Sequence, residues 1–207
     1  MILMMNKPKG YLTARSDRTR ATVMELLPPE LQQLHPVGRL DMDTEGLLLL
    51  TDDGRLDPLL LRPEAHVEKV YFFRAFGRLE QADFERMAAG VVLEGTGVVS
   101  LPARAWPEGR TTIGACEALL PPRKHNRLMK NPDRPVTEGW IAIREGRKHQ
   151  VKLMVKAVGG HVFTLKRTRF GPLALDPALA PGEYRPLTPE ETALLTGGAA
   201  PSPAALV

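Results

Sequence analysis

The chain has little of what a metalloprotein, a disulfide-bonded protein or a membrane protein needs. Cys116 is its one cysteine, which excludes an intramolecular disulfide, and its five histidines show no metal-ligand spacing. Apolar runs such as residues 46–50 are too short to cross a bilayer, and residues 1–5 reach Lys7 without a signal-peptide core. We therefore expect a cytoplasmic protein with no metal and no cofactor, whose 43% hydrophobic content can bury a core.

Net positive charge is confined to one region of the chain, because the rest carries more acids than Lys and Arg. Residues 123–169 carry thirteen Lys or Arg against three acids, a net of +10, whereas the net charge of all 207 residues is +4. A local positive field of this size usually serves a polyanion, which makes nucleic acid the leading partner. A solvated basic face without a ligand is the alternative explanation. The basic loop at residues 123–130 is a candidate grip on an RNA backbone.

Helical and strand patterns alternate irregularly along the chain. Strands are expected at residues 1–6, 47–50, 69–77, 140–143 and 162–170, with short strands between 91 and 120. Helices are expected at residues 22–27, 29–34, 81–89 and 148–158, and a capping box at 188–191 opens a last short helix. In the 148–158 helix, Lys148, Lys152 and Lys156 form a cationic row. Residues 121–135 read as a loop. This order predicts an α+β fold.

The densest polar feature is an acidic cluster at residues 38–46, directly before the apolar run. An EF-hand calcium loop from Asp41 to Asp52 fits poorly, because position 12 lacks Glu and Pro36 lies where a helix should precede the loop. A phosphotransferase D-x-D site fits poorly too, since no apolar strand precedes Asp41. The third candidate is one carboxylate acting on a sugar carbon beside cations that hold a nucleic acid.

A resemblance makes the third candidate specific. The segment GRLDMDTEGLLLLTDDG at residues 38–54 resembles the signature of the RsuA/RluB/RluE/RluF family of pseudouridine synthases, and only Asp52, in place of Asn, departs from it. Four other segments agree with the family in order and spacing: NKPKG at 6–10, KVY at 69–71, EGRKHQVKLM at 145–154 and LKRTRFGPL at 165–173. The resemblance covers most of residues 2–187.

The resemblance implies a pseudouridine synthase fold, with a mixed, mainly antiparallel sheet in two lobes and helices packed around a central RNA-binding cleft. The catalytic domain is expected over residues 1–196, with a lobe boundary near 60–70 and a disordered tail at 197–207. Family members with an S4 RNA-binding module carry it before the first strand, and this chain starts directly in the catalytic domain. It is therefore similar to the RluE-type enzymes, which implies a uridine of 23S rRNA; a tRNA or 16S rRNA target stays open.

The family resemblance also implies roles for individual residues. Asp41 is the catalytic carboxylate that acts on the ribose C1′ of a flipped-out uridine, and Arg39 enters the RNA stack where that base leaves. Tyr71 lies against the uracil, and Lys152 keeps Asp41 ionised. From the residues alone, a turn Asp, a surface salt bridge, a core aromatic and a solvated Lys are the respective alternatives. The remaining RNA-binding residues implied are Lys69, Arg147, Lys148, His149, Gln150, Lys166 and Arg167.

The expected partner is RNA, free or in an assembling ribosomal particle, and the protein is expected to be a monomer. Two rival functions remain. A non-catalytic RNA-binding or ribosome-assembly factor would tolerate loss of Asp41, and the intact set of Asp41, Tyr71 and Lys152 argues against it. An RNA hydrolase or metal-dependent phosphotransferase that uses Asp41, Asp43 and Glu45 together would require a divalent ion and lose activity with a chelator.

Overall fold

The computed structural model describes residues 1–62 and 65–197 and divides the chain into two compact units. Unit 1 contains Met1–Lys69 together with the chain from Lys166 onward, and unit 2 contains Val70–Leu165. The sequence suggested one boundary near 60–70; the structure adds a second crossing at 165/166, within one strand. The tail expected at 197–207 lies, apart from Gly197, outside the described residues. Across the described ranges no helix is long and apolar enough to span a membrane.

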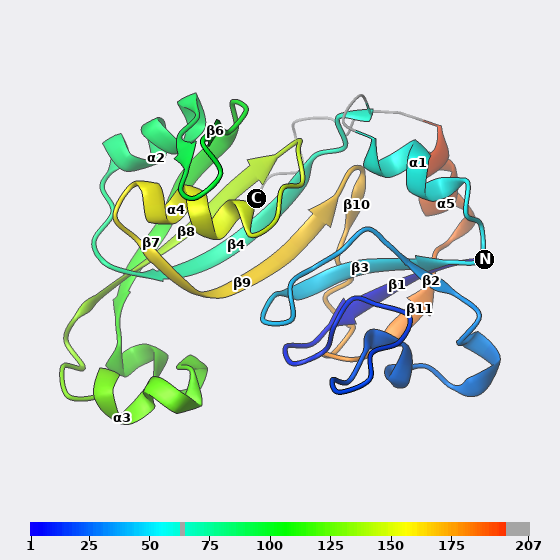
Figure 1. The fold of residues 1–207 in the computed structure, drawn as a ribbon, viewed down its shortest axis with the longest axis horizontal. Coiled ribbons are helices and arrows are strands. Elements are labelled where there is room, and N and C mark those ends of the chain that lie inside the picture. The colour runs from blue at the N-terminus through cyan, green and yellow to red at the C-terminus, as the bar shows by residue number, and fades with distance from the viewer. Residues whose placement is uncertain (63–64, 198–207) are drawn as a thin grey trace. The chain divides into compact units, whose positions relative to one another are not determined.

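Unit 1 is built on a sheet whose strand order is β11, β1, β3, β9 (Figure 1). Strand β3 (Glu45–Thr51) pairs antiparallel with β1 (Ile2–Lys7) and parallel with β9 (His161–Phe170). Short strands β2 (His35–Val37), β10 (Leu173–Ala174) and β11 (Tyr184–Pro186) pair antiparallel with β3, β9 and β1. All four leucines of β3 are buried, so both faces of the sheet are covered at this strand.

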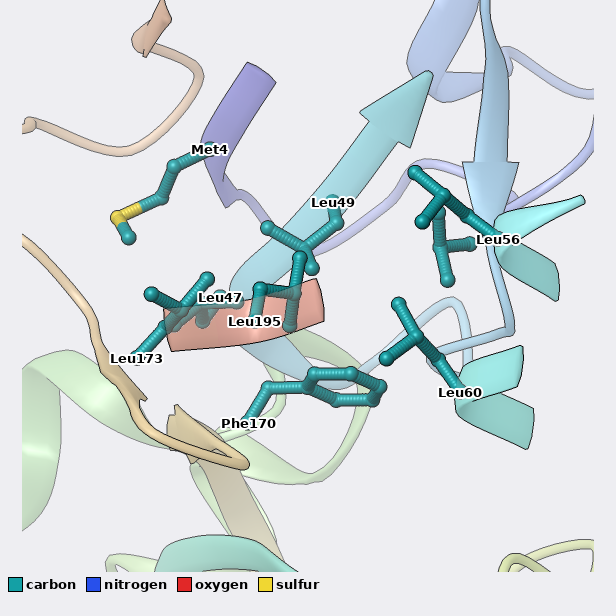
Figure 2. Packing of buried hydrophobic residues seen from close by; sticks show 9 residues of the cluster. Met4, Leu47, Leu49, Leu56, Leu60, Phe170, Leu173 and Leu195 are labelled. Carbon is teal, nitrogen blue, oxygen red and sulfur yellow. The ribbon is translucent and has the colours of Figure 1, made fainter. Parts of the chain in front are cut away.

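The core of unit 1 lies between the sheet and two helices, α1 (Leu56–Leu61) and α5 (Pro189–Thr196). Figure 2 shows apolar side chains from β1, β3, β9, β10 and both helices meeting in one cluster. Its labelled members are Met4, Leu47, Leu49, Leu56, Leu60, Phe170, Leu173 and Leu195. The C-terminal segment belongs to unit 1 because its apolar side chains in this cluster cover apolar side chains of the first fifty residues.

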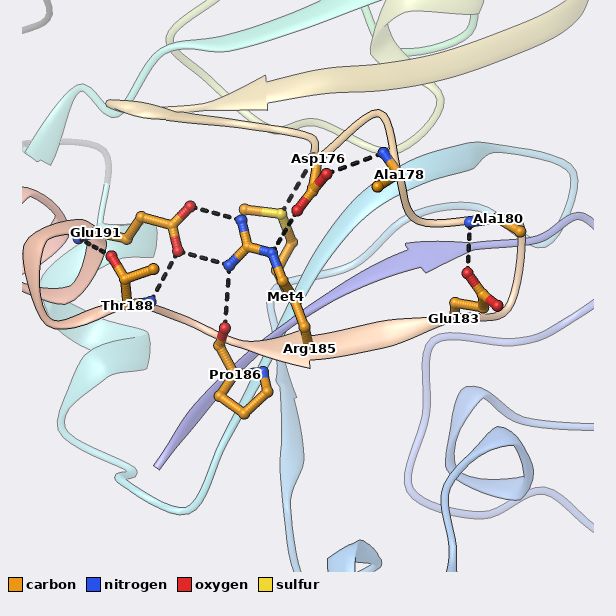
Figure 3. A network of polar contacts seen from close by, with 9 residues as sticks. All are labelled: Met4, Asp176, Ala178, Ala180, Glu183, Arg185, Pro186, Thr188 and Glu191. Atoms are coloured by element: carbon orange, nitrogen blue, oxygen red, sulfur yellow. Dashed lines mark hydrogen bonds and ion pairs between the residues drawn. The ribbon is translucent and has the colours of Figure 1, made fainter.

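Arg185 fastens that C-terminal segment (Figure 3). Its guanidinium donates to Asp176 at 2.6 Å and to both oxygens of Glu191 at 2.7 and 2.8 Å. Glu191 also closes the capping box of α5, because its carboxylate accepts from the Thr188 N–H and its own N–H donates to the Thr188 hydroxyl. The capping box predicted at residues 188–191 is confirmed.

Unit 2 has the strand order β9, β4, β8, β7. Strand β8 (Pro135–Ile143) pairs antiparallel with β7 (Arg104–Thr112), and β4 runs from Lys69 to Phe76. Helices α2 (Gln81–Ala89), α3 (His125–Leu128) and α4 (Gln150–Ala157), and a hairpin of β5 (Val92–Leu93) and β6 (Val98–Val99), complete the unit. The expected α+β fold with a mixed sheet is confirmed.

The two faces of β4 carry different aromatic side chains. On one face, Phe73 stacks on Phe84 of α2 with ring centroids 6.2 Å apart. On the other, Phe72 contacts Trp140 of β8 at 5.0 Å, and Trp140 stacks on Trp106 of β7 at 6.3 Å. Since strand side chains alternate, Tyr71 lies on the same face as Phe73.

Four expected elements differ from the structure. Residues 121–135 are not a plain loop, because they hold the 3-10 turn Pro122–Lys124 and α3, whose Leu128 enters an apolar cluster. The helices expected at 22–27 and 29–34 are single 3-10 turns, Val23–Leu26 and Pro29–Leu31. Helix α4 begins at Gln150 because His149 is left-handed with φ 55°, so Lys148 is not in one helical row with Lys152 and Lys156.

Candidate active site

Asp41 lies in a tight turn that leads into β3. The Thr44 N–H closes the turn onto the Asp41 carbonyl at 3.0 Å, and the Gly10 N–H donates to the Met42 carbonyl at 2.8 Å. Before the turn, the Thr13 hydroxyl donates to the Leu40 carbonyl at 2.8 Å and accepts from the Leu40 N–H at 3.2 Å. The half-buried Asp41 carboxyl group is therefore carried on a backbone fixed from both sides.

Lys7 donates hydrogen bonds to the turn that carries Asp41. No role was predicted for Lys7 from the sequence. Its side chain is fully buried at the end of β1, and its ammonium donates to the Thr44 and Pro8 carbonyls, each at 2.9 Å. The Met42 carbonyl completes the set at 3.5 Å. Burying a charged group is costly unless hydrogen bonds compensate it. These hydrogen bonds keep the ammonium of Lys7 next to the Asp41 turn. A lysine at the end of a mostly apolar strand was the available signal.

The two other acids of the cluster, Asp43 and Glu45, lie in different environments from Asp41. Asp43 is exposed in the turn, and Glu45 pairs with Lys9 at 3.5 Å. Strands β2 and β3 flank the segment, whereas an EF-hand needs helices on both sides. Within the described residues no group of three or more His, Cys, Asp or Glu side chains could hold a metal ion.

Gly46 allows β9 to lie close beside the Asp41 turn. It pairs with Arg167 in parallel register and has φ +102°, and a Cβ there would stand 2.2 Å from the Arg167 carbonyl oxygen. Only glycine satisfies both conditions. The glycine of the acidic motif therefore joins β3 to the cation-bearing strand β9.

Tyr71 and Lys152 lie on β4 and α4 of unit 2. Tyr71 is 8% exposed, so most of its ring is inside the unit. Lys152 is half-buried and follows Val151, which anchors the apolar face of α4 together with Met154 and Val155. The helix thus holds Lys152 at the margin of its buried face.

The loop before α4 is clamped by a small polar network in unit 2. Glu145 accepts from Arg147 Nε at 3.0 Å, from the Leu101 N–H at 2.8 Å and from the Gln150 amide. Gln150 is 3% exposed and accepts from the Arg147 N–H at 2.9 Å. Both ends of the Gln150 amide are therefore used inside the protein, where they fix the loop that presents Arg147 and Lys148.

The residues expected to bind RNA fall into two classes of exposure. Arg39, Arg147, Lys148 and His149 are exposed, and Lys166 is half-buried. Lys69 and Arg167, by contrast, are only 8% and 2% exposed. Burial and the neighbouring Arg167 charge lower the pKa of Lys69 to about 8. The sequence could not show which of these basic residues are buried, because the residue type and its position in a strand do not reveal the burial of a single side chain.

The predicted site residues are divided between the two units. Unit 1 supplies Arg39, Asp41, Lys69, Lys166 and Arg167, and unit 2 supplies Tyr71, Arg147, Lys148, His149, Gln150 and Lys152. Each unit thus combines one candidate for the uridine chemistry, Asp41 or Tyr71, with cations that suit a nucleic acid.

Comparison with known proteins decides the family. The model of the family described as RNA pseudouridylate synthase matches residues 1–157. The chain belongs to the RNA pseudouridylate synthase family. This synthase is an isomerase that modifies RNA, as the resemblance predicted.

Individual relatives of the synthase agree with this. It is 44% identical over 195 residues to "Uncharacterized RNA pseudouridine synthase YtzG" of Bacillus subtilis (strain 168), covering 93% of this chain and 72% of the relative. It is 39% identical over 191 residues to "Ribosomal small subunit pseudouridine synthase A" of Escherichia coli (strain K12), covering 92% and 71%. A solved pseudouridylate synthase superposes with a TM-score of 0.77 at 33% identity, covering 94% of this chain and 73% of the other.

Two finer expectations are not settled by these comparisons. The RluE-type subgroup and its 23S rRNA target are not confirmed, because the curated relatives above carry other names. The roles expected for single residues of the synthase stay predictions.

Proposed function

We propose that this synthase converts one uridine of ribosomal RNA to pseudouridine and that small-subunit RNA is its first candidate substrate. The 39% identity to an enzyme named for the ribosomal small subunit supports this target. The RluE-type resemblance of the sequence favours 23S rRNA instead, so both RNAs belong in the test.

The fixed Asp41 turn is the observation that carries the proposed mechanism. A carboxylate that attacks or stabilises the ribose C1′ must be held in place while the uracil detaches from N1, turns and rejoins through C5. The turn meets this need, because backbone hydrogen bonds and the buried Lys7 hold it. In the proposal Tyr71 lies against the uracil, Lys152 keeps Asp41 ionised, and Arg39 fills the stack after the base leaves.

The basic side chains that are exposed or half-buried are proposed to hold the RNA backbone. Arg147, Lys148 and His149 lie on the clamped loop before α4, and Lys166 lies on β9. Such side chains contact phosphates and orient the RNA without reading its sequence.

The decisive experiment is pseudouridine mapping by carbodiimide-dependent reverse-transcriptase stops on total RNA. Cells lacking this gene are complemented with the wild type, Asp41→Asn or Asp43→Asn. We expect one stop to disappear with the gene and to return with the wild type and Asp43→Asn but not with Asp41→Asn. A stop in small-subunit RNA supports the proposed target, and one in 23S rRNA or tRNA replaces it. Restoration by Asp41→Asn would refute the catalytic role of Asp41.

A further inference from the structure

Two buried cations share one aromatic ring in unit 1. Lys69, at the start of β4, places its ammonium 5.8 Å from the centroid of the Phe170 ring, and Arg167 of β9 places its guanidinium carbon 5.1 Å from it. Phe170 itself is 1% exposed. The two cations therefore lie inside the unit, unlike the exposed basic residues around the site.

The hydrogen bonds of this pair are incomplete. Arg167 Nε donates to the Leu47 carbonyl at 2.8 Å, which fixes the guanidinium against β3. Its Nη2 is buried without a hydrogen-bond partner among the residues that the structure describes. Buried polar groups are nearly always satisfied, so an orphaned guanidinium nitrogen points to a ligand.

The charges of the pair are also uncompensated. The low pKa of Lys69 has two causes, burial and the Arg167 charge, and no carboxylate offsets them. The charged neighbours in sequence and register are Lys166 and Arg169 on β9, Glu68 before Lys69, and Glu45 on β3, which pairs with Lys9. Attraction to one aromatic ring is small beside the cost of removing two cations from water.

We propose that Lys69 and Arg167 form a binding site for one phosphate group, which a backbone phosphate of the RNA substrate occupies. This identification of the ligand rests on the proposed function, whereas the anion site itself rests on the two side chains. An ammonium and a guanidinium nitrogen can each donate to phosphate oxygens. A backbone phosphodiester offsets one of the two positive charges, and an inorganic phosphate dianion offsets both. Because the site is buried, salt screens this contact less than it screens contacts to the exposed cations.

Binding at this site has a signature that exposed lysines lack. An anion beside Lys69 favours its charged form and raises its pKa, so the protein takes up a proton when phosphate binds near pH 8. Lys156 offers a matched control, since it is exposed on α4 and pairs with Glu94. Its substitution removes the same charge from the chain without touching the buried pair.

The first test measures thermal unfolding of the full chain with inorganic phosphate against chloride at matched ionic strength. We expect phosphate well above its Kd to raise the Tm of the wild type and of Lys156→Met by about 2–4 °C, and to leave Lys69→Met unchanged. Lys69→Gln replaces Lys69→Met if that variant does not fold. Calorimetry in two buffers of different ionisation enthalpy should show proton uptake in the wild type and none in the Lys69 variant. Equal phosphate effects in the wild type and the Lys69 variant would overturn the site.

The second test identifies the source of the phosphate. Inorganic phosphate should weaken RNA binding by the wild type more than chloride does, and this excess should vanish in Lys69→Met. If phosphate stabilises the protein but does not compete with RNA, the site takes free phosphate and the RNA assignment is wrong. Neither measurement depends on pseudouridine formation, so the anion site and the proposed function can fail separately.

Discussion

Lys7 and Thr44, 37 residues apart, are joined by a 2.9 Å hydrogen bond from a fully buried ammonium to a backbone carbonyl. Thr44 closes the turn that carries Asp41, so the N-terminal strand and the candidate catalytic carboxylate are linked through one side chain. We expect Lys7 to act as a positioning residue, because its ammonium donates to the turn carbonyls of Met42 and Thr44 as well as to Pro8.

Lys7→Met should therefore damage both stability and catalysis. The substitution leaves buried carbonyls without a donor, which should lower the free energy of unfolding by about 2–4 kcal/mol. Displacement of the Asp41 turn should reduce kcat at least about tenfold with a smaller change in KM. Lys9→Met removes a partly exposed ion pair and should cost less than about 1 kcal/mol. Urea unfolding and tritium release from RNA labelled at uridine C5 measure both quantities; equal behaviour of the two variants would exclude the positioning role.

Gly46→Ala should be among the most destabilising single-methyl additions in unit 1. The new Cβ meets the Arg167 carbonyl oxygen, and the residue keeps φ +102°. Gly10→Ala isolates the backbone strain, because Gly10 has φ +92° but no atom within 4 Å of the place that a Cβ would take. We expect a loss of about 1–2 kcal/mol for Gly10→Ala and at least about 2 kcal/mol more for Gly46→Ala. If denaturant unfolding gave similar losses of unfolding free energy for the two variants, close contact between β9 and β3 at Gly46 would be excluded.

Lys69→Met should stabilise the phosphate-free protein at pH 7. The pKa of Lys69 falls from 10.5 to about 8 on folding, so the unfolded chain binds the extra proton between these values. Stability contributed by this group is therefore lowest below pH 8 and rises with pH until about 10.5. The variant should gain up to about 3 kcal/mol at pH 7, and the gain should fade across that window. Unfolding curves at several pH values would contradict this if the difference did not depend on pH.

Arg185→Met should loosen the C-terminal segment and make the protein less sensitive to acid. Hydrogen bonds from the Ala178 N–H and Arg185 lower the pKa of Asp176, and those from Arg185 lower the pKa of Glu191. Their contribution is present at neutral pH and is lost as pH falls through the lowered values. We expect a loss of stability at pH 7 that shrinks as the pH falls through the lowered pKa values of these two carboxyl groups. An Arg78→Met control, at an exposed ion pair, should show little of this change.

Charge removal in the 123–130 segment should weaken RNA binding through its salt dependence. Arg123, Lys124, Arg127 and Lys130 are exposed, whereas Leu128 is buried. Alanine at the four basic positions therefore spares the apolar contact that a deletion would remove. The slope of log K against log salt should fall in magnitude by up to about 3. Filter binding across a salt series measures it, with Lys156→Ala as the single-charge control. An unchanged slope would exclude these residues from the RNA interface.

Several parts of the fold followed from local sequence signals. The run of four leucines predicted β3, the 3.6-residue period predicted α2 at Gln81–Ala89, and Thr188 with Glu191 predicted the start of α5. Motif order also identified the family and singled out Asp41. These features depend on neighbouring residues in the chain, so the sequence alone contains them.

Tertiary structure decided the rest, because burial and pairing depend on which distant segments meet. The sequence determined that Lys69, Lys7 and Arg167 are cations near family motifs, and it could not show that all three are buried. The left-handed His149 shortened the expected helix, and β9 returned the chain to unit 1, where Arg167 meets Phe170 and Lys69. Residue type and spacing thus set the chemistry available to this protein. Long-range packing decided which of its charges stay in water and which are enclosed together, where an anion would neutralise them.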